Sequence, residues 1–420
     1  MSGSLGGGLR SVEEQLADVL AAVRPLPART VDLADADGMT LRDPALARGG
    51  IPAFDNSAMD GFAVRFDDVS GASDAHPVEL TVVADLPAGG SDDPPLRAGQ
   101  AARIMTGAPV PTDADAIVPF EDTAGGLEDS LRVVRVLRAP ARPSAFVRRA
   151  HDDLRPGDRV LEPGALLGAL QLAAAAAADV PRLTVSERPR VAIVSTGSEL
   201  VEPGAPRTHG QIPESNGLLL AALVRAAGGT VVARERVDDD GPGLRHVLER
   251  TAAGDDRADV LITSGGVSAG AYEVVKTELG DALRFSRVAM QPGKPQAFGV
   301  LPSGTMVFGL PGNPVSAAVS FEVFVRPALL ALQGRSDLQR PALRLPAGTA
   351  WRTPPGRRQY LPAAIDRSDP ARWTVGPATA GGSGSHLAGG LSRAEAYAIV
   401  PAEVLEVSPG DLVDVLLLEG

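Results

Sequence analysis

Three loops rich in glycine, serine and threonine follow three short apolar runs in the middle of the chain. Glycine lets backbone amides approach a ligand closely, and a helix N-terminus presents free N–H groups to an anion. In a doubly wound sheet, ligands bind outside the carboxyl ends of the strands. The three loops therefore predict a phosphate-bearing ligand at one edge of a sheet. The runs and the loops after them are 191–194 and 195–199, 260–263 and 264–270, and 306–309 and 310–316.

Only two of the 40 basic residues are lysine, and both lie close to these loops in the sequence. Lys276 follows the 264–270 loop, and Lys294 lies between two prolines that stiffen its backbone. An ammonium is a compact point charge, whereas a guanidinium is a planar fork, so the two do not interchange at a tight anion site. The chain carries a net charge of −12, so an anionic ligand needs local cations. We interpret the lysines as phosphate ligands; the alternative for Lys294 is a solvated surface turn.

Carboxylates are predicted at the same edge of the sheet. Glu199 follows the first strand, residues 238–240 follow the second, and Glu273 follows the 264–270 loop. Mg²⁺ binds one or two carboxylates beside phosphates and keeps several waters. The alternative for 238–240 is a solvated loop or a helix cap. The five histidines lie far apart, which argues against a transition-metal site made of protein ligands.

A second polar segment lies earlier in the chain, at residues 51–63. It places turn-forming polar residues, Asp60 among them, between the large apolar residues Phe54, Met59 and Phe62. A bare surface turn does not need three such anchors, so we expect a rigidly held polar loop. Residues 104–108 similarly end a strand with a hydroxyl and a glycine.

Composition excludes several classes of protein. A length of 420 residues predicts two to four domains, and 44% apolar with 22% charged residues is typical of a soluble globular chain. The negative charge disfavours nucleic acid as a partner. With no cysteine, disulfides, zinc–thiolate sites and cysteine nucleophiles are excluded. The apolar stretch 165–178 is too short to span a membrane, and residues 1–10 lack the apolar core of a secretory signal. We expect a cytoplasmic protein without a membrane partner.

The pattern of apolar residues predicts a multidomain α/β fold. Ser11 and Glu14 fit a capping box before a helical stripe that Pro25 stops. A second, alanine-rich helix is expected after Gly164, running to Asp179, and could pair with the first. Between them lies a β-rich region, and the chain after Gly334 reads as a small β-barrel or sandwich. The middle third alternates strands and helices, as in a doubly wound, mostly parallel sheet. Its expected strands are 191–194, 230–233, 260–263 and 306–309, and its helices 218–227, 244–253, 273–279 and 315–332.

Six segments together resemble the molybdopterin molybdenumtransferase family, which also includes the E domain of gephyrin. Any one of them could arise by chance, but all six in this order are hard to explain otherwise. The resemblance covers nearly the whole chain after Arg10. The segments are PAFDNSAMDGFAV at 52–64, IMTGAPVP at 104–111, VSTGSEL at 194–200, TSGGVSAG at 263–270, PGKPQAFG at 292–299 and GLPGNPVS at 309–316.

The resemblance implies an elongated homodimer of four-domain subunits. It divides the chain into a helical lid from two segments (10–52 and 142–182), a β-rich module (53–141), a central doubly wound α/β domain (183–333) and a C-terminal β-barrel (334–420). The implied reaction joins molybdate to adenylylated molybdopterin, with Mg²⁺, and releases AMP. The active site is expected between the α/β domain of one subunit and the lid and β module of the other. Other proteins of molybdenum cofactor biosynthesis are implied as partners.

Residue roles follow from the same resemblance. Asp60, Thr106, Glu199 and Asp153 are implied as catalytic, and Glu199, Asp239 and Glu273 as metal-binding. Family members usually carry Asp where this chain has Glu273, and four further positions, Ser198, Arg287, Gln291 and Pro362, also depart from the family pattern. The residues implied to hold the pterin and its phosphates are Ser195, Thr196, Gly197, Ser215, Asn216, Ser264, Gly265, Gly266, Ser268, Lys276, Lys294, Pro311, Gly312, Asn313, Pro314 and Ser385.

Two other functions stay open from the sequence. A related α/β domain by itself is associated with adenylylating molybdopterin from ATP, but relatives with that activity lack the β module and the Asp60 loop. The E domain of gephyrin also anchors membrane receptors, so a scaffold is the second alternative. A scaffold should tolerate loss of Asp60, Thr106 and Glu199, whereas an enzyme should not.

Overall fold

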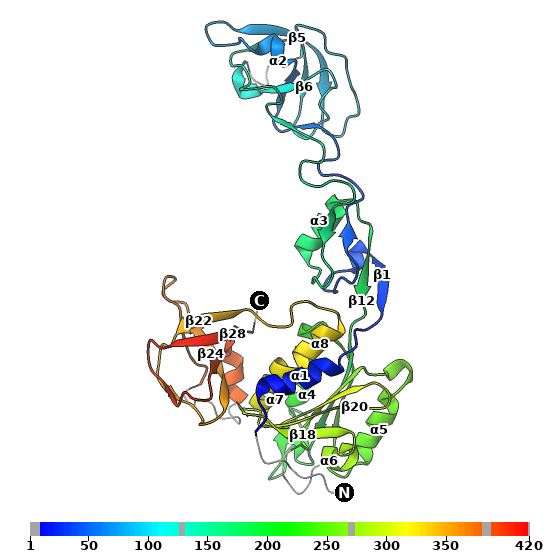
Figure 1. Ribbon diagram of the computed structural model, residues 1–420, viewed down its shortest axis with the longest axis vertical. Coiled ribbons are helices and arrows are strands. Elements are labelled where there is room, and N and C mark those ends of the chain that lie inside the picture. The colour runs from blue at the N-terminus through cyan, green and yellow to red at the C-terminus, as the bar shows by residue number, and fades with distance from the viewer. Residues whose placement is uncertain (1–8, 126–130, 268–273, 380–387, 419–420) are drawn as a thin grey trace.

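The computed structural model describes residues 9–125, 131–267, 274–379 and 388–418. Figure 1 shows an elongated molecule with a β module at one end. A smaller unit that contains helix α3 (Ala169–Ala177) follows, and the other end is a broad body in which an α/β domain and a C-terminal β-sheet lie side by side. The chain passes up to the β module and back again, so the module is an insertion, as the sequence predicts.

The body is built on a six-stranded sheet in the order β16-β13-β17-β21-β20-β18. The first four strands run parallel and coincide with the four strands expected from the sequence. The antiparallel strands β20 and β18 complete the sheet and were not predicted. The strands are β13 (Arg190–Thr196), β16 (Thr230–Val237), β17 (Val260–Ser264), β18 (Leu283–Arg287), β20 (Pro295–Val300) and β21 (Met306–Leu310).

Helices cover both faces of this sheet, which explains why its central strands are almost continuously apolar. Ile193 and Ile262 pack in one apolar cluster with α4 and α8, whereas their neighbours Val194 and Leu261 pack in the other with α5 and α6. Successive strand residues point to opposite faces, so each face has its own core. The helices are α4 (Asn216–Ala226), α5 (Pro242–Thr251), α6 (Val274–Leu279), α7 (Pro314–Ser320) and α8 (Arg326–Leu332).

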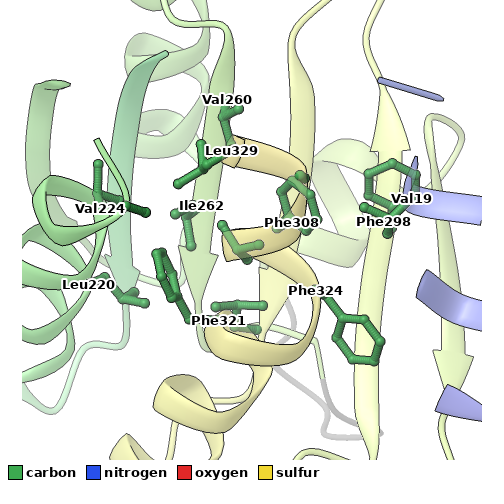
Figure 2. Packing of buried hydrophobic residues seen from close by; sticks show 14 of the residues in the cluster. Val19, Leu220, Val224, Val260, Ile262, Phe298, Phe308, Phe321, Phe324 and Leu329 are labelled. Carbon is green, nitrogen blue, oxygen red and sulfur yellow. The ribbon is translucent and has the colours of Figure 1, made fainter. Parts of the chain in front are cut away.

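The larger core is centred on a long helix that runs through α7, a π-helical turn (Phe321–Val325) and α8. Figure 2 shows Phe321 and Leu329 beside the strand residues Val260 and Ile262. This segment, Pro314–Leu332, is long and apolar enough to cross a membrane, but 83% of it is buried inside the fold. It is therefore the core helix of the sheet.

The N-terminal helix α1 (Val12–Ala22) has the predicted capping box: Glu14 N donates to Ser11 Oγ at 3.0 Å, and Ser11 N donates to a Glu14 carboxylate oxygen at 2.9 Å. Its partner differs from the one predicted. Val19 is fully buried in the core of the central sheet, where α1 contacts α8 and the π-helical turn. The expected pairing with α3 is wrong, because the apolar stripe of α1 is buried by the body before the chain reaches the lid.

The unit between body and β module, here called the lid, is formed by two segments joined mainly by strands. β1 (Ala28–Asp32) pairs with β12 (Arg182–Ser186), and β2 (Ala45–Leu46) pairs with β11 (Arg159–Leu161). α3 begins five residues later than Gly164, because Gly168 is still extended with φ −128° and ψ −171°. The lid is therefore less helical than expected.

The β module contains a sheet in the order β7-β4-β6-β5-β9-β8. Its apolar face buries Phe62 against Phe120 in an edge-to-face contact with ring centroids 5.3 Å apart. The elements are β3 (Asn56–Ser57), β4 (Gly61–Val64), α2 (Phe66–Val69), β5 (Val78–Leu86), β6 (Gln100–Ile104), β7 (Ala116–Pro119), β8 (Thr123–Ala124), β9 (Val133–Val136) and β10 (Val147–Arg148).

The C-terminal region forms a sheet in the order β19-β24-β26-β28-β22, with β25 paired to β24. Ala347, just after β22, bridges to Val375 in β25, so the sheet nearly closes into the expected barrel. β19 belongs to the α/β domain in sequence and joins the two parts. The strands are β19 (Met290–Gln291), β22 (Ala342–Pro346), β23 (Trp351–Arg352), β24 (Arg358–Asp366), β25 (Thr374–Pro377), β26 (Ala396–Val400), β27 (Glu406–Val407) and β28 (Leu412–Leu417).

We expect Phe321→Ala to lower the free energy of unfolding by about 3–5 kcal/mol, because a large side chain with 1% exposure leaves a cavity in the core. Leu170→Ala is the control, since Leu170 on α3 is 81% exposed and should cost little. Urea denaturation followed by circular dichroism compares the two variants. Equal stability of both would contradict the packing described here.

Candidate functional site

A polar cleft of about 530 Å³ lies at the carboxyl ends of strands β13, β17 and β21. Its position is the one that the three glycine-rich loops predict. The loops that line it come from six separate stretches of the chain, which the fold of the sheet brings together. The lining residues are Thr196, Gly197, Glu199, Leu200, Ile212, Asn216, Asp239, Ser264, Gly265, Gly266, Val267, Gln291, Pro292, Gly293, Lys294, Pro295, Pro311, Gly312, Asn313 and Ser316.

Asn216 connects two of these loops. It begins helix α4, and its side-chain nitrogen Nδ2 donates to Ser264 Oγ and to the Gly312 carbonyl oxygen, each at 2.6 Å. The Gly312 carbonyl oxygen can only accept a hydrogen bond, so the nitrogen of the Asn216 side-chain amide must face it. The two loops after β17 and β21 are thereby fixed relative to each other and to α4.

A buried carboxylate fixes the third loop. Glu214 Oε1 accepts from Ser195 Oγ at 2.9 Å and from Gly217 N at 2.7 Å, and Glu214 is only 7% exposed. Ser195 is itself buried and does not line the cleft. The sequence predicts that Ser195 binds the ligand. In the structure its side chain instead makes a structural contact that ties the end of β13 to the start of α4.

Glycine at position 265 is required by a close approach of two backbones. Gly265 has φ +95°, and a Cβ there would lie 2.7 Å from the Thr196 carbonyl oxygen. Its N–H donates to the Leu310 carbonyl oxygen at 3.0 Å. No larger residue fits without moving the backbone of the β13 loop, so Gly265 keeps three loops in contact around the cleft.

Two acidic side chains line the cleft, Glu199 and Asp239. Asp239 Oδ2 accepts from the backbone N–H of Ser198 at 3.1 Å and from its hydroxyl at 3.2 Å, which holds the carboxylate beside the β13 loop. Among the described residues, no group of three or more His, Cys, Asp or Glu side chains could hold a metal. Two carboxylates suit Mg²⁺, which takes its remaining ligands from water and phosphate.

The two lysines separate in the structure. Lys294 is half-buried and lines the cleft, as predicted. Lys276 lies on α6, is exposed, and is not among the residues that line the cleft. The sequence places both near the loops, but α6 covers a face of the sheet and turns Lys276 away from the site.

Asp60 and Thr106 form a second polar site in the β module. Asp60 Oδ1 accepts from the Thr106 backbone N–H at 2.6 Å, and both residues are exposed. This hydrogen bond lowers the pKa of Asp60 below the ordinary aspartate value, and a hydrogen bond from the Thr106 side chain makes a smaller contribution in the same direction. The pairing of these two segments, 46 positions apart, supports the prediction that they act together.

The segment that carries Asp60 is anchored at the junction between β module and lid, where Asp55 lies beside Arg149 and Ala150; this junction is called the neck. Asp55 accepts from the Ala150 backbone N–H at 2.7 Å and from the Arg149 guanidinium at 2.5 Å, and these contacts lower the pKa of Asp55. Arg149 also donates to Ser144 Oγ at 2.5 Å. The expected polar loop is therefore held by hydrogen bonds, and Asp55 joins the outgoing chain to the returning one. Phe54, one of the three expected apolar anchors, is 47% exposed and does not anchor the loop.

The remaining predicted site residues have varied places. Asp153 is exposed near the neck, Ser215 is the residue before α4, and Pro314 begins α7; none of them lines the cleft. Ser268, Glu273 and Ser385 lie outside the described residues. Val267 and Ser316 also line the cleft and lie within the predicted loops 264–270 and 310–316. Other lining residues were not predicted as site residues, because they lie outside the three glycine-rich loops: Leu200, Ile212, Gln291, Pro292, Gly293 and Pro295.

The cleft and the Asp60–Thr106 pair lie in different parts of the chain. The cleft is in the body, whereas Asp60 immediately precedes β4 of the β module. Figure 1 shows the body and the β module at opposite ends of the molecule, with the lid between them. A single chain therefore does not combine the two sets of residues.

Comparison with known proteins decides the family. Family models match three parts of the chain: the "MoeA N-terminal region (domain I and II)" at residues 10–178, the "Probable molybdopterin binding domain" at 192–331 and the "MoeA C-terminal region (domain IV)" at 344–418. "Molybdopterin molybdenumtransferase 2" of Mycobacterium tuberculosis is 44% identical, and the match covers 96% of this chain and 98% of the relative. The chain belongs to the molybdopterin molybdenumtransferase family.

Two further proteins match this chain over nearly its whole length. "Molybdopterin molybdenumtransferase 1" of Mycobacterium tuberculosis is 36% identical over 98% of this chain and 99% of its own. A crystal structure of the molybdopterin biosynthesis MoeA protein from Pyrococcus horikoshii is 28% identical, with a TM-score of 0.78, and covers 98% of this chain and 100% of that one. The structural match thus spans body, lid, β module and barrel together.

We expect Asp60 to titrate below the ordinary aspartate value in carboxyl ¹³C NMR. Because its folded pKa is lowered, any stability that it contributes is present above the unfolded aspartate value and is lost as pH falls through the folded value. Asp60→Asn should remove this part of the pH dependence and leave the rest of the acid denaturation curve unchanged. A normal titration midpoint for Asp60 would contradict the Thr106 hydrogen bond.

Proposed function

We propose that this enzyme inserts molybdate into adenylylated molybdopterin and releases AMP, which gives molybdenum cofactor. The observation that carries the proposal is the cleft, where loop amides, one lysine and two carboxylates converge at the ends of parallel strands in a member of this family. A pterin nucleotide combines phosphate charge with a flat polar ring. A cleft of about 530 Å³ with this lining suits such a ligand.

The residues of the cleft take distinct roles in this proposal. The amides of Gly266 and Gly312 and the ammonium of Lys294 bind the pterin and its phosphates. Thr196 and Asn216 orient the ligand from the ends of β13 and α4. The substrate brings its own dithiolene sulfurs as soft ligands for molybdenum, so a chain without cysteine is sufficient.

Glu199 and Asp239 would hold Mg²⁺ beside the phosphoanhydride. When bound, the ion would neutralise charge on the phosphate oxygens. Asp239 is held in place by Ser198 while Glu199 stays exposed at the edge of the cleft, so one carboxylate is fixed and the other is free to adjust. Attack of water on the adenylyl phosphorus would break the phosphoanhydride, release AMP and free the pterin phosphate.

Asp60 and Thr106 would bind molybdate and act in its insertion, with Asp153 near the neck. Because the cleft and the Asp60–Thr106 pair occupy opposite ends of one subunit, we propose that a second subunit supplies the pair. An antiparallel homodimer would place the β module and lid of one chain over the cleft of the other. This arrangement explains the elongated shape and the exposed position of both residues.

The β module distinguishes this proposal from its alternatives. An enzyme that only adenylylates molybdopterin has no need of the Asp60 loop, yet here Asp55 and Thr106 hold that loop in a defined position. A scaffold has no need of a preorganised polar cleft. Both observations favour the transferase, which we propose to be a soluble cytoplasmic protein.

We expect Asp60→Ala to abolish molybdate-dependent AMP release and to leave the dimer folded, since Asp60 is exposed and its loss creates no cavity. AMP release from adenylylated molybdopterin is measured with and without molybdate. Asp92→Ala in the same module is the control, because Asp92 is also an exposed aspartate but has no place in the proposed site. Turnover of Asp60→Ala at the wild-type rate would refute the role of Asp60.

We expect Lys294→Arg to bind adenylylated molybdopterin about tenfold more weakly, because a planar guanidinium does not replace a point charge in a narrow cleft. Lys276→Arg should bind as the wild type does, since Lys276 is exposed and outside the cleft lining. Isothermal titration calorimetry gives both dissociation constants. An unchanged dissociation constant for Lys294→Arg would show that Lys294 is a solvated lysine that does not bind the ligand.

A further inference from the structure

The loop that carries Lys294 rests on a buried glutamine. Gln296 is 3% exposed, and its side-chain nitrogen Nε2 donates to the Gly293 carbonyl oxygen and to Ser320 Oγ, each at 2.7 Å. The Gly293 carbonyl can only accept, so the nitrogen of the amide must face it. Both hydrogens of this nitrogen are therefore used to join the loop to Ser320, the fully buried last residue of α7.

The loop also lies directly against the helix end. Gly293 has φ +103°, and a Cβ there would lie 3.0 Å from Ser320 Oγ and 3.0 Å from the terminal methyl carbon of Met290. A side chain at this position would push the loop away from α7. Gly293 and Gln296 together fix the position of the loop relative to the end of α7.

The two ends of the loop are held as well. Val288 N donates to the Lys294 carbonyl oxygen at 2.8 Å, and β19 pairs with β24 of the barrel. The Arg357 guanidinium donates to Gln291 Oε1 at 2.6 Å. With its flanks held, the loop presents the Lys294 side chain to the cleft, and Gln296 is the support beneath its centre.

We propose that Gln296, acting with Ser320, is a positioning residue that sets where the Lys294 ammonium lies in the cleft. Gln296 does not line the cleft and so acts only through the loop. The inference rests on the proposed function insofar as Lys294 binds a phosphate. Displacement of a binding group by about 1 Å can cost a hundredfold in rate, so the loss of this support should be measurable.

The test compares two buried glutamines of the α/β domain. Gln296→Leu removes both donated hydrogen bonds at nearly constant volume. Gln333→Leu is the matched control, because Gln333 is also 3% exposed and its Nε2 donates to the Ala227 and Leu329 carbonyl oxygens, away from the cleft. A general effect of removing a buried amide should appear equally in both variants.

The first measurement needs no ligand. Because the chain has only two lysines, selective ¹³C-lysine labelling gives one signal set for Lys294 and one for Lys276. We expect Gln296→Leu to shift the Lys294 side-chain signals and leave those of Lys276 unchanged, and Gln333→Leu to move neither. Ser320→Ala should shift Lys294 in the same direction by a smaller amount, and it decides the question if Gln296→Leu does not fold.

The second measurement uses AMP, the proposed product, as the probe. We expect AMP to bind Gln296→Leu about tenfold more weakly than wild type and Gln333→Leu with unchanged affinity. Unchanged Lys294 signals in folded Gln296→Leu, or in Ser320→Ala where it is the test, would overturn the positioning role. Shifted signals with unchanged AMP affinity would instead overturn binding of the adenylyl phosphate by Lys294, so failures of the two proposals are distinguishable.

Discussion

The side-chain amide of Asn216 holds the cleft together. Its two hydrogen bonds, to Ser264 Oγ and to the Gly312 carbonyl oxygen, join loops that are 48 and 96 positions away in the sequence. Parallel strands bring these loops to one edge but do not fix the distance between them. The buried amide does so, and the contact of Gly265 with Thr196 and the Glu214–Ser195 pair complete the constraint. The cleft is thus preorganised before any ligand binds.

A second constraint is the distance between the two polar sites. Asp55 ties the outgoing and returning chains at the neck, so the β module carries Asp60 and Thr106 as a unit. The lid separates this unit from the cleft in the same subunit (Figure 1). The proposed homodimer follows from this separation, since the chain holds each half of the proposed machinery at a different end.

Local sequence patterns predicted much of the fold correctly. The capping box of Ser11 and Glu14 and the four parallel strands are confirmed, because each depends on residues close together in the chain. The helix expected after Gly164 is present as α3, but the partner of α1 was predicted wrongly. An apolar stripe shows that a helix is buried but carries no information about which surface buries it.

The sequence by itself determined the family and the three loops and singled out Lys276 and Lys294 as candidate ligands, since these follow from residue types in short motifs. Only the tertiary structure decided that Lys294 and not Lys276 faces the cleft, that Ser195 bonds Glu214, and that Gln296 supports the Lys294 loop. The reason is geometric. A motif specifies which groups are present, whereas the direction of each side chain depends on helices and strands that pack from distant parts of the chain.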